Sequence, residues 1–131
     1  PIGIQTFEEI RRDGYLYVDK TAMVYQIANV GVFPSTWEEP FALTCLEAIA
    51  SSLPVIITRS GGMPEIVDGE CGIVVKNDEN LVNSLAVAMK NIYGMDKVKL
   101  KNMALHSVLR AQLFDNQLQY KQFVEYIHSK I

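Results

Sequence analysis

Short apolar runs recur along the first part of the chain, with longer amphipathic segments between and after them. Residues 30–33 (VGVF), 54–58 (PVIIT) and 72–75 (GIVV) contain no charged residue, and residues 15–18 (YLYV) precede them with a similar character. Short β-branched and aromatic runs predict β-strands, and runs without a two-residue polar alternation predict strands that are buried on both faces.

Helical spacing is found in the segments around these runs. Thr6 and Glu9 form a capping box for a short first helix, and Asp19 or Thr21 can cap a second helix that runs to about Ala28. A third helix is expected over about residues 41–51, and Pro64 is expected at the first position of a short fourth helix.

The C-terminal part of the chain is predicted to be almost entirely helical. Asp78 is a candidate cap for the first of its helices, Gly94 interrupts the pattern, and residues 114–116 (FDN) interrupt it again. The apolar positions that recur at helical spacing are Leu81, Leu85, Ala88, Met89 and Ile92, then Leu100, Met103, Ala104, Val108, Ala111 and Leu113, then Tyr120, Val124, Ile127 and Ile131.

The alternation of strands and helices predicts the fold class. Strand, helix, strand, turn and helix, strand, helix is the order of an α/β protein with a parallel sheet. We therefore expect a truncated Rossmann-like three-layer unit: a short parallel sheet of about four strands, helices on both faces, and a long helical C-terminus. In open sheets of this kind, ligands bind beyond the carboxyl ends of the strands.

Composition and charge exclude several classes of function. The 131 residues, of which 49% are hydrophobic, suffice for one core. Charged residues make up 21% and the net charge is −3, so the chain lacks the basic excess of a nucleic-acid-binding protein. No apolar run reaches the roughly 20 residues that span a bilayer, and residues 1–14 do not resemble a secretory signal. The expected location is the cytoplasm.

Cysteine and histidine positions do not indicate a metal site or a cofactor. Cys45 and Cys71 are far apart in the sequence, so they form neither a disulfide framework nor a metal-binding cluster, and we expect two ordinary buried thiols. His106 and His128 are expected on the surface, as are the lysines at positions 97, 99 and 101, which indicate a solvated face.

The loop PSTWEEPFAL, residues 34–43, carries the candidate chemistry. It follows a predicted strand and leads into the third helix, whose first backbone amides have no intrahelical partners and suit an anionic phosphate. Glu39 lies at this helix mouth and Glu47 lies eight positions later, which offsets the two carboxylates by about 80° around a helix. The alternative is a solvated helix start with acidic residues placed favourably for the helix dipole, and a partly exposed Glu47 without a ligand.

Residues 34–75 closely resemble the nucleotide-sugar-binding, C-terminal domain of retaining GT-B glycosyltransferases of the group 1 type. The shared motifs are Glu39 and Glu47 with seven residues between them, a segment ending in PVI, a GG-x-PE-I-V turn at residues 61–67, and the GIVV run. The resemblance extends from about Tyr25 to the last helix. It departs from the family pattern at Ala42 and Ser52, where the family usually has glycine; Ala42 narrows the approach of a sugar, and Ser52 reads as a variation at a helix end.

The resemblance implies a role for each candidate residue. Glu39 is the implied catalytic glutamate near the donor sugar, and Glu47 is the implied partner of the nucleotide ribose. The segment of Phe41, Ala42 and Leu43 is implied to face the sugar and the diphosphate through its amides. Gly61 and Gly62 are candidates for further loop contacts, although a purely structural turn is the more favoured interpretation. The implied reaction transfers a sugar from a nucleotide donor with retention, without an obligatory metal.

A second resemblance concerns residues 1–25, which are similar to the beginning of bacterial AAA-ATPase-like proteins, although no P-loop follows. We therefore expect residues 1–24 to be an extension of different origin and residues 25–131 to be a partial glycosyltransferase domain. Two family features are not found in the sequence: the acceptor-binding N-terminal domain, and the Arg/Lys pair that neutralises the diphosphate. Lys20 and Arg59 are substitutes by residue type only.

Two functions remain open. The first is the donor-binding half of a glycosyltransferase, which would bind a nucleotide-diphosphate sugar weakly at most. This half would be inactive alone and would need the missing acceptor domain, or a partner chain that supplies it. The alternative is a non-catalytic fusion or interaction module, which associates with itself through surface left exposed by truncation.

Overall fold

The structure is a computed structural model in which residues 21–38 and 40–130 are described. Three strands in this part of the chain form a parallel sheet in the order β1-β2-β3. Gly31 lies opposite Val55 in the first strand pair, and Val55 lies opposite Gly72 in the second. The strands are β1 (Gly31–Phe33), β2 (Val55–Thr58) and β3 (Gly72–Val75).

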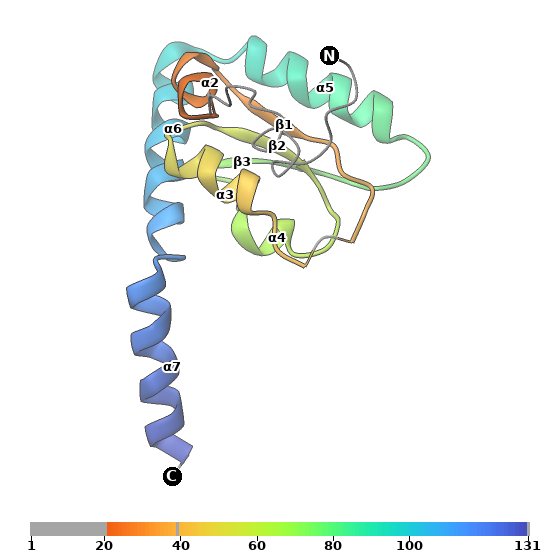
Figure 1. Cartoon of the computed structure of the whole chain (residues 1–131). Helices are drawn as coiled ribbons and strands as arrows, with labels where there is room; N and C mark the ends of the chain where they lie inside the picture. The colour runs from red at the N-terminus through yellow and green to blue at the C-terminus, as the bar shows by residue number, and fades with distance from the viewer. Residues whose placement is uncertain (1–20, 39, 131) are drawn as a thin grey trace, which may run out of the picture.

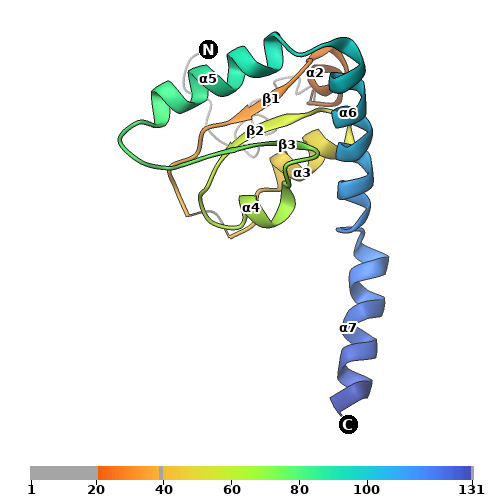
Figure 2. The same cartoon turned by 180° about the vertical axis from the view of Figure 1, so that it is seen from behind.

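Helices cover both faces of this sheet, and Figures 1 and 2 show α5 on one face with α3 and α4 on the other. The layers follow the predicted three-layer α/β architecture. The helices of the described residues are α2 (Thr21–Ile27), α3 (Leu43–Ala50), α4 (Met63–Ile66), α5 (Leu81–Tyr93), α6 (Lys97–Gln112) and α7 (Asn116–Lys130).

The core lies in two parts because successive residues of a strand point to opposite faces. Val55 and Ile57 of β2 pack with Ile49 of α3 and Ile66 of α4 on one face. Ile56, between them in sequence, packs on the other face with residues of α5. All four residues of β2 are buried, as its continuous apolar run predicts for a central strand covered on both sides.

The C-terminal end of α3 places Ser52 in a backbone conformation that glycine adopts more readily. The N–H of Ser52 donates to the carbonyl of Ile49, and the N–H of Leu53 donates to the carbonyl of Ala48, each at 3.1 Å. This is a Schellman arrangement, and it holds Ser52 in the left-handed region at a φ of 64°. The serine is therefore a helix-end variation, as predicted, with a conformational cost that glycine would not have.

The strand predictions at 30–33, 54–58 and 72–75 are confirmed, while some helix starts differ from expectation. α3 begins at Leu43 and not near 41, because Ala42 has a non-helical ψ of 84°. α6 begins at Lys97, because the carboxylate of Asp96 accepts the N–H of Lys99 at 2.9 Å and caps the helix. The prediction of Asp78 as the cap of α5 is wrong: Asn80 holds that position, and its N–H donates to the Asp78 carboxylate at 3.0 Å.

α7 continues beyond α6 and projects away from the sheet and its helices (Figures 1 and 2). Asp115 caps it, because its carboxylate accepts the N–H groups of Gln117 and Leu118 at 2.9 and 3.1 Å. No residue of α7 is buried. The capping-box helix near Thr6 and the strand predicted over 15–18 lie outside the described residues.

Candidate functional site

The carboxyl ends of β1 and β2 lead into two neighbouring loops, one before α3 and one before α4 (Figure 1). A cavity of about 310 Å³ lies at this edge of the sheet, beside the end of β1 and the start of α3. It is lined by Val32, Phe33, Pro34, Ser35, Ala42, Thr44 and Met63. The location is the one at which open parallel sheets bind ligands.

The beginning of α3 borders this cavity. Ala42 is the residue before the first helical turn, is 3% exposed, and offers no side chain that could cap the helix. The first N–H groups of a helix have no intrahelical acceptor and carry partial positive charge. Of the two residues beside Ala42, Phe41 is half-exposed and Leu43 is exposed, and the Phe41 ring lies 6.0 Å from the Phe114 ring. The start of α3 thus combines accessible surface with amides that no side chain caps, although the N–H of Leu43 donates to the carbonyl oxygen of Phe41 at 3.2 Å.

Glu47 lies one turn into α3, and its side chain is exposed to solvent. The Tyr25 hydroxyl lies 3.4 Å from its Oε2 atom and 3.2 Å from the carbonyl oxygen of Thr44. Burial and the negative charge of Glu47 raise the pKa of Tyr25, so the hydroxyl keeps its proton and remains a donor over a wider pH range. The Glu47 carboxylate is therefore accessible at one side and supported by a neutral donor at the other.

Gly61 and Gly62 lie where the second loop meets the first. Gly61 has a φ of 52°, and its N–H donates to Oε2 of Glu38 at 2.9 Å. A Cβ atom at Gly62 would lie 2.3 Å from the carbonyl oxygen of Pro40, far closer than atoms can approach. The left-handed φ therefore favours glycine at position 61, and the contact with the other loop requires glycine at position 62; a direct ligand contact by either of them stays a prediction.

Three further residues that the sequence reasoning missed hold the same loop. Thr58 Oγ1 donates to the carbonyl oxygen of Ser35, and the Asn77 amide donates to that of Thr36 at 3.4 Å. The Glu38 carboxylate is the third. The sequence pattern could have indicated Thr58 and Asn77, because Thr58 ends β2 and Asn77 follows β3. Polar residues at these strand ends lie at the edge of the sheet where ligands bind.

Glu39, the predicted catalytic residue, lies outside the described residues, as does Lys20. Arg59 is exposed directly after β2, and its N–H donates to the carbonyl oxygen of Val75 at 2.8 Å. Within residues 21–38 and 40–130, no group of three His, Cys, Asp or Glu side chains could hold a metal ion. None of the helices in this part of the chain has the length and apolar character needed to cross a membrane. His106 and His128 are exposed and the two cysteines are buried, as predicted.

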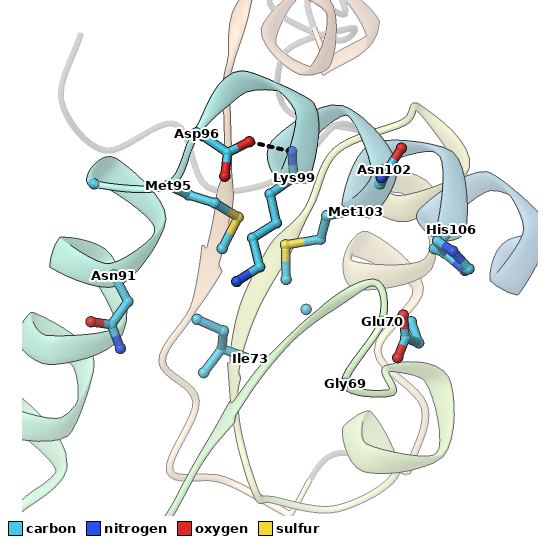
Figure 3. Close-up of a pocket in the computed structure, with 12 residues that line it drawn as sticks. Gly69, Glu70, Ile73, Asn91, Met95, Asp96, Lys99, Asn102, Met103 and His106 are labelled. Carbon is cyan, nitrogen blue, oxygen red and sulfur yellow. Dashed lines mark hydrogen bonds between the residues drawn. The ribbon is translucent and has the colours of Figure 1, made fainter.

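A larger cavity of about 800 Å³ lies at the opposite end of the sheet, between the start of β3, the end of α5 and the start of α6. Figure 3 shows the side chain of Lys99 pointing into it, with Met95, Met103 and Ile73 around the ammonium group. Asn91, Asn102 and His106 reach its rim and are all exposed. This cavity lies away from the carboxyl ends of the strands and contains none of the candidate residues.

Comparison with known proteins gives several relatives that are named as glycosyltransferases. The chain is 40% identical over 65 residues to a D-inositol 3-phosphate glycosyltransferase of Corynebacterium diphtheriae, and this match covers 49% of this chain and 15% of that protein. It is 34% identical over 89 residues to an uncharacterized glycosyltransferase of Methanocaldococcus jannaschii, and this match covers 65% of this chain and 20% of that protein. These matches therefore span a fifth or less of the length of either relative.

A solved structure and a family model agree with these relatives. Sucrose-phosphate synthase from Thermosynechococcus elongatus superimposes with a TM-score of 0.68 at 28% identity, covering 95% of this chain and 34% of that protein. The model of the family described as glycosyl transferases group 1 matches residues 5–94, a range that begins within the N-terminal segment expected to have a different origin. On these grounds, the chain belongs to the group 1 glycosyl transferases.

Proposed function

We propose that this chain forms the donor-binding part of a nucleotide-sugar-dependent glycosyltransferase that transfers the sugar with retention. The observation that carries the proposal is the meeting, at the carboxyl edge of the sheet, of the uncapped start of α3, the cavity beside it, and the exposed carboxylate of Glu47. Helix amides bind diphosphate oxygens, and a carboxylate one turn further along binds ribose hydroxyls. Glu39 is the proposed group at the donor sugar.

The chemistry asked of these residues is mainly electrostatic. When the bond between the anomeric carbon and the diphosphate breaks, negative charge develops on the leaving diphosphate, and oriented amides at a helix start lower the energy of that charge. The amides of the Phe41, Ala42 and Leu43 segment are the proposed donors. Arg59 is exposed directly after β2, at the same edge of the sheet, and could contribute a cation.

The 131-residue chain is proposed to be inactive as a transferase by itself. Its matches span a fifth or less of the two curated relatives described above, so residues beyond this chain would have to supply the acceptor site. We expect the isolated chain to bind a nucleotide without transferring a sugar. We expect sugar transfer once an acceptor-binding part is added.

The test is a titration of the chain with UDP, GDP and ADP, each with and without an attached sugar, followed by NMR of the backbone amides. One nucleotide should shift the amides of residues 41–47 at millimolar concentration or below. Glu47→Gln should weaken binding, whereas Glu125→Gln, at an exposed position on α7, serves as the matched control. Unchanged amides of residues 41–47 with all three nucleotides at millimolar concentration contradict the proposal.

A second candidate is an interaction module that associates with itself. It is favoured by α7, which has no buried residue and exposes Tyr120, Phe123 and Tyr126 at 71%, 61% and 59%. Exposed apolar surface of this extent is typical of contact sites. Light scattering at increasing concentration decides: dimers that the double variant Phe123→Ser, Tyr126→Ser abolishes support self-association, and a strict monomer at high concentration excludes it.

A further inference from the structure

The two loops at the carboxyl edge of the sheet are joined by long-range hydrogen bonds. Glu38 Oε2 accepts the N–H of Gly61 at 2.9 Å across 23 residues of sequence. Asn77 Nδ2 donates at 2.9 Å to the hydroxyl of Ser60, which is 2% exposed, and at 3.4 Å to the carbonyl oxygen of Thr36 across 41 residues. The loop before α3 is thus held by residues that follow both β2 and β3.

The loop has little other regular support. No helix or strand is found between Phe33 and Leu43 in the described residues. The hydroxyl of Thr58 holds the carbonyl of Ser35 at the start of the loop, and Gly62 lies against Pro40 near its end. Glu38 lies between these points, so its bond to Gly61 restrains the middle of the loop.

Glu38 is an exposed carboxylate directly before the proposed sugar glutamate, and the two could share a ligand role. The geometry favours different roles, because Oε2 of Glu38 already accepts a main-chain N–H of the neighbouring loop. An ordered loop binds a ligand more tightly than a mobile one, since the cost of ordering it has been met on folding.

We propose that Glu38 is a positioning residue that fixes the loop before α3 against the Gly61 turn, so that the donor site is ordered before its ligand arrives. Asn77 is the second support of the same loop. The expected effect of Glu38 on nucleotide affinity rests on the proposed donor-binding function. The effect on loop order is independent of it and can be measured without a ligand.

Two variants of Glu38 separate the hydrogen bond from the charge. Glu38→Gln retains a side-chain oxygen that can accept the Gly61 N–H, whereas Glu38→Ala removes the acceptor. Losing a hydrogen bond of this strength should accelerate hydrogen exchange of the Gly61 amide about 10-fold in Glu38→Ala. Trp37, the only tryptophan of the chain and the neighbour of Glu38, is 74% exposed, and its fluorescence anisotropy, which reports local motion, should fall in Glu38→Ala. Glu38→Gln should behave like the wild type in both measurements, as should the control Glu125→Gln.

The nucleotide that the wild type binds in NMR then provides the functional measurement. Its dissociation constant should rise about 5- to 10-fold in Glu38→Ala and less than about 2-fold in Glu38→Gln, in line with the loss of one hydrogen bond. Unchanged Gly61 exchange in Glu38→Ala overturns the inference, and so does a Glu38→Gln variant that binds as weakly as Glu38→Ala, because the charge would then be what matters. A wild type that binds no nucleotide overturns the proposed function, while Gly61 exchange and Trp37 anisotropy still decide the loop-ordering role.

Discussion

The contact between Gly62 and Pro40 allows a sharp test of how tightly the two loops fit. In Gly62→Ala, the new Cβ would lie 2.3 Å from the carbonyl oxygen and 3.2 Å from the carbonyl carbon of Pro40. An ordinary contact begins at 3.4 Å, so the backbone of one loop must move by about 1 Å. The φ of Gly62 is −80°, which alanine adopts without strain, so the entire effect is steric.

The expected cost of this substitution is that of overpacking, about 1–3 kcal/mol. For a chain of this size, the melting temperature should fall by roughly 3–12 °C. Differential scanning calorimetry measures the fall, and NMR should show shifted amides over residues 34–43. Nucleotide affinity should fall as well, because the loop that moves leads into the start of α3.

Gly69→Ala is the matched control. A Cβ at Gly69 would meet no atom within 4 Å, and its φ is not in the left-handed region. The substitution should be neutral or stabilise the fold by up to about 1 kcal/mol, through the smaller entropy of the unfolded chain. Equal melting temperatures of Gly62→Ala and Gly69→Ala would refute the argument that the loops are closely packed.

Three further predictions concern other parts of the fold. Ser52→Gly should stabilise the protein by about 1 kcal/mol in urea unfolding, since glycine adopts the left-handed φ of 64° without cost, and a loss of stability would contradict this. Although burial opposes its charge, hydrogen bonds from Cys71 and the positive charge of Arg110 hold the pKa of Asp68 below its usual value of 3.8. Because this pKa is lowered, the charged Asp68 stabilises the fold above about pH 4, and this stabilisation is lost as the pH falls further. In thermal melts, the wild type should therefore be more stable than Asp68→Asn by a constant amount above pH 5, and the difference should shrink between pH 5 and pH 3. Burial raises the pKa of the Cys71 thiol to about 11, and the side chain is fully buried, so a thiol reagent at pH 8 should label it only at the rate of unfolding; rapid labelling of the native protein would contradict this.

The sequence predicted most of the layer structure, because local patterns are sufficient for it. The run PVIIT lacks charged residues, and its residues 55–58 become the central strand β2, buried on both faces. GIVV at 72–75 becomes β3 without a change of boundary. Helix starts were predicted less well, since they depend on single residues: the backbone of Ala42 delays the start of α3, and Asn80, not Asp78, holds the cap position of α5.

The candidate site was predicted only in part. Position after a strand and before a helix was enough to single out the segment of Ala42, which lines the cavity at the carboxyl edge of the sheet, while Glu47 lies one turn into α3. The residues that hold the loop could not be found in the same way, because the Asn77 bond to Thr36 and the Glu38 bond to Gly61 connect positions far apart in sequence. The roles proposed for Glu39 and Glu47 at the ligand stay predictions.

The lack of buried residues in α7 has a consequence for how the chain unfolds. A helix of 15 residues is about 22 Å long, and a helix of this length that buries no residue is marginally stable in water. Its helix content should therefore follow a gradual helix–coil equilibrium, while the sheet and the helices that cover it unfold in one cooperative step. Far-ultraviolet circular dichroism would then show a sloping loss of signal on heating before the main transition, and the chain would tumble anisotropically while α7 is formed.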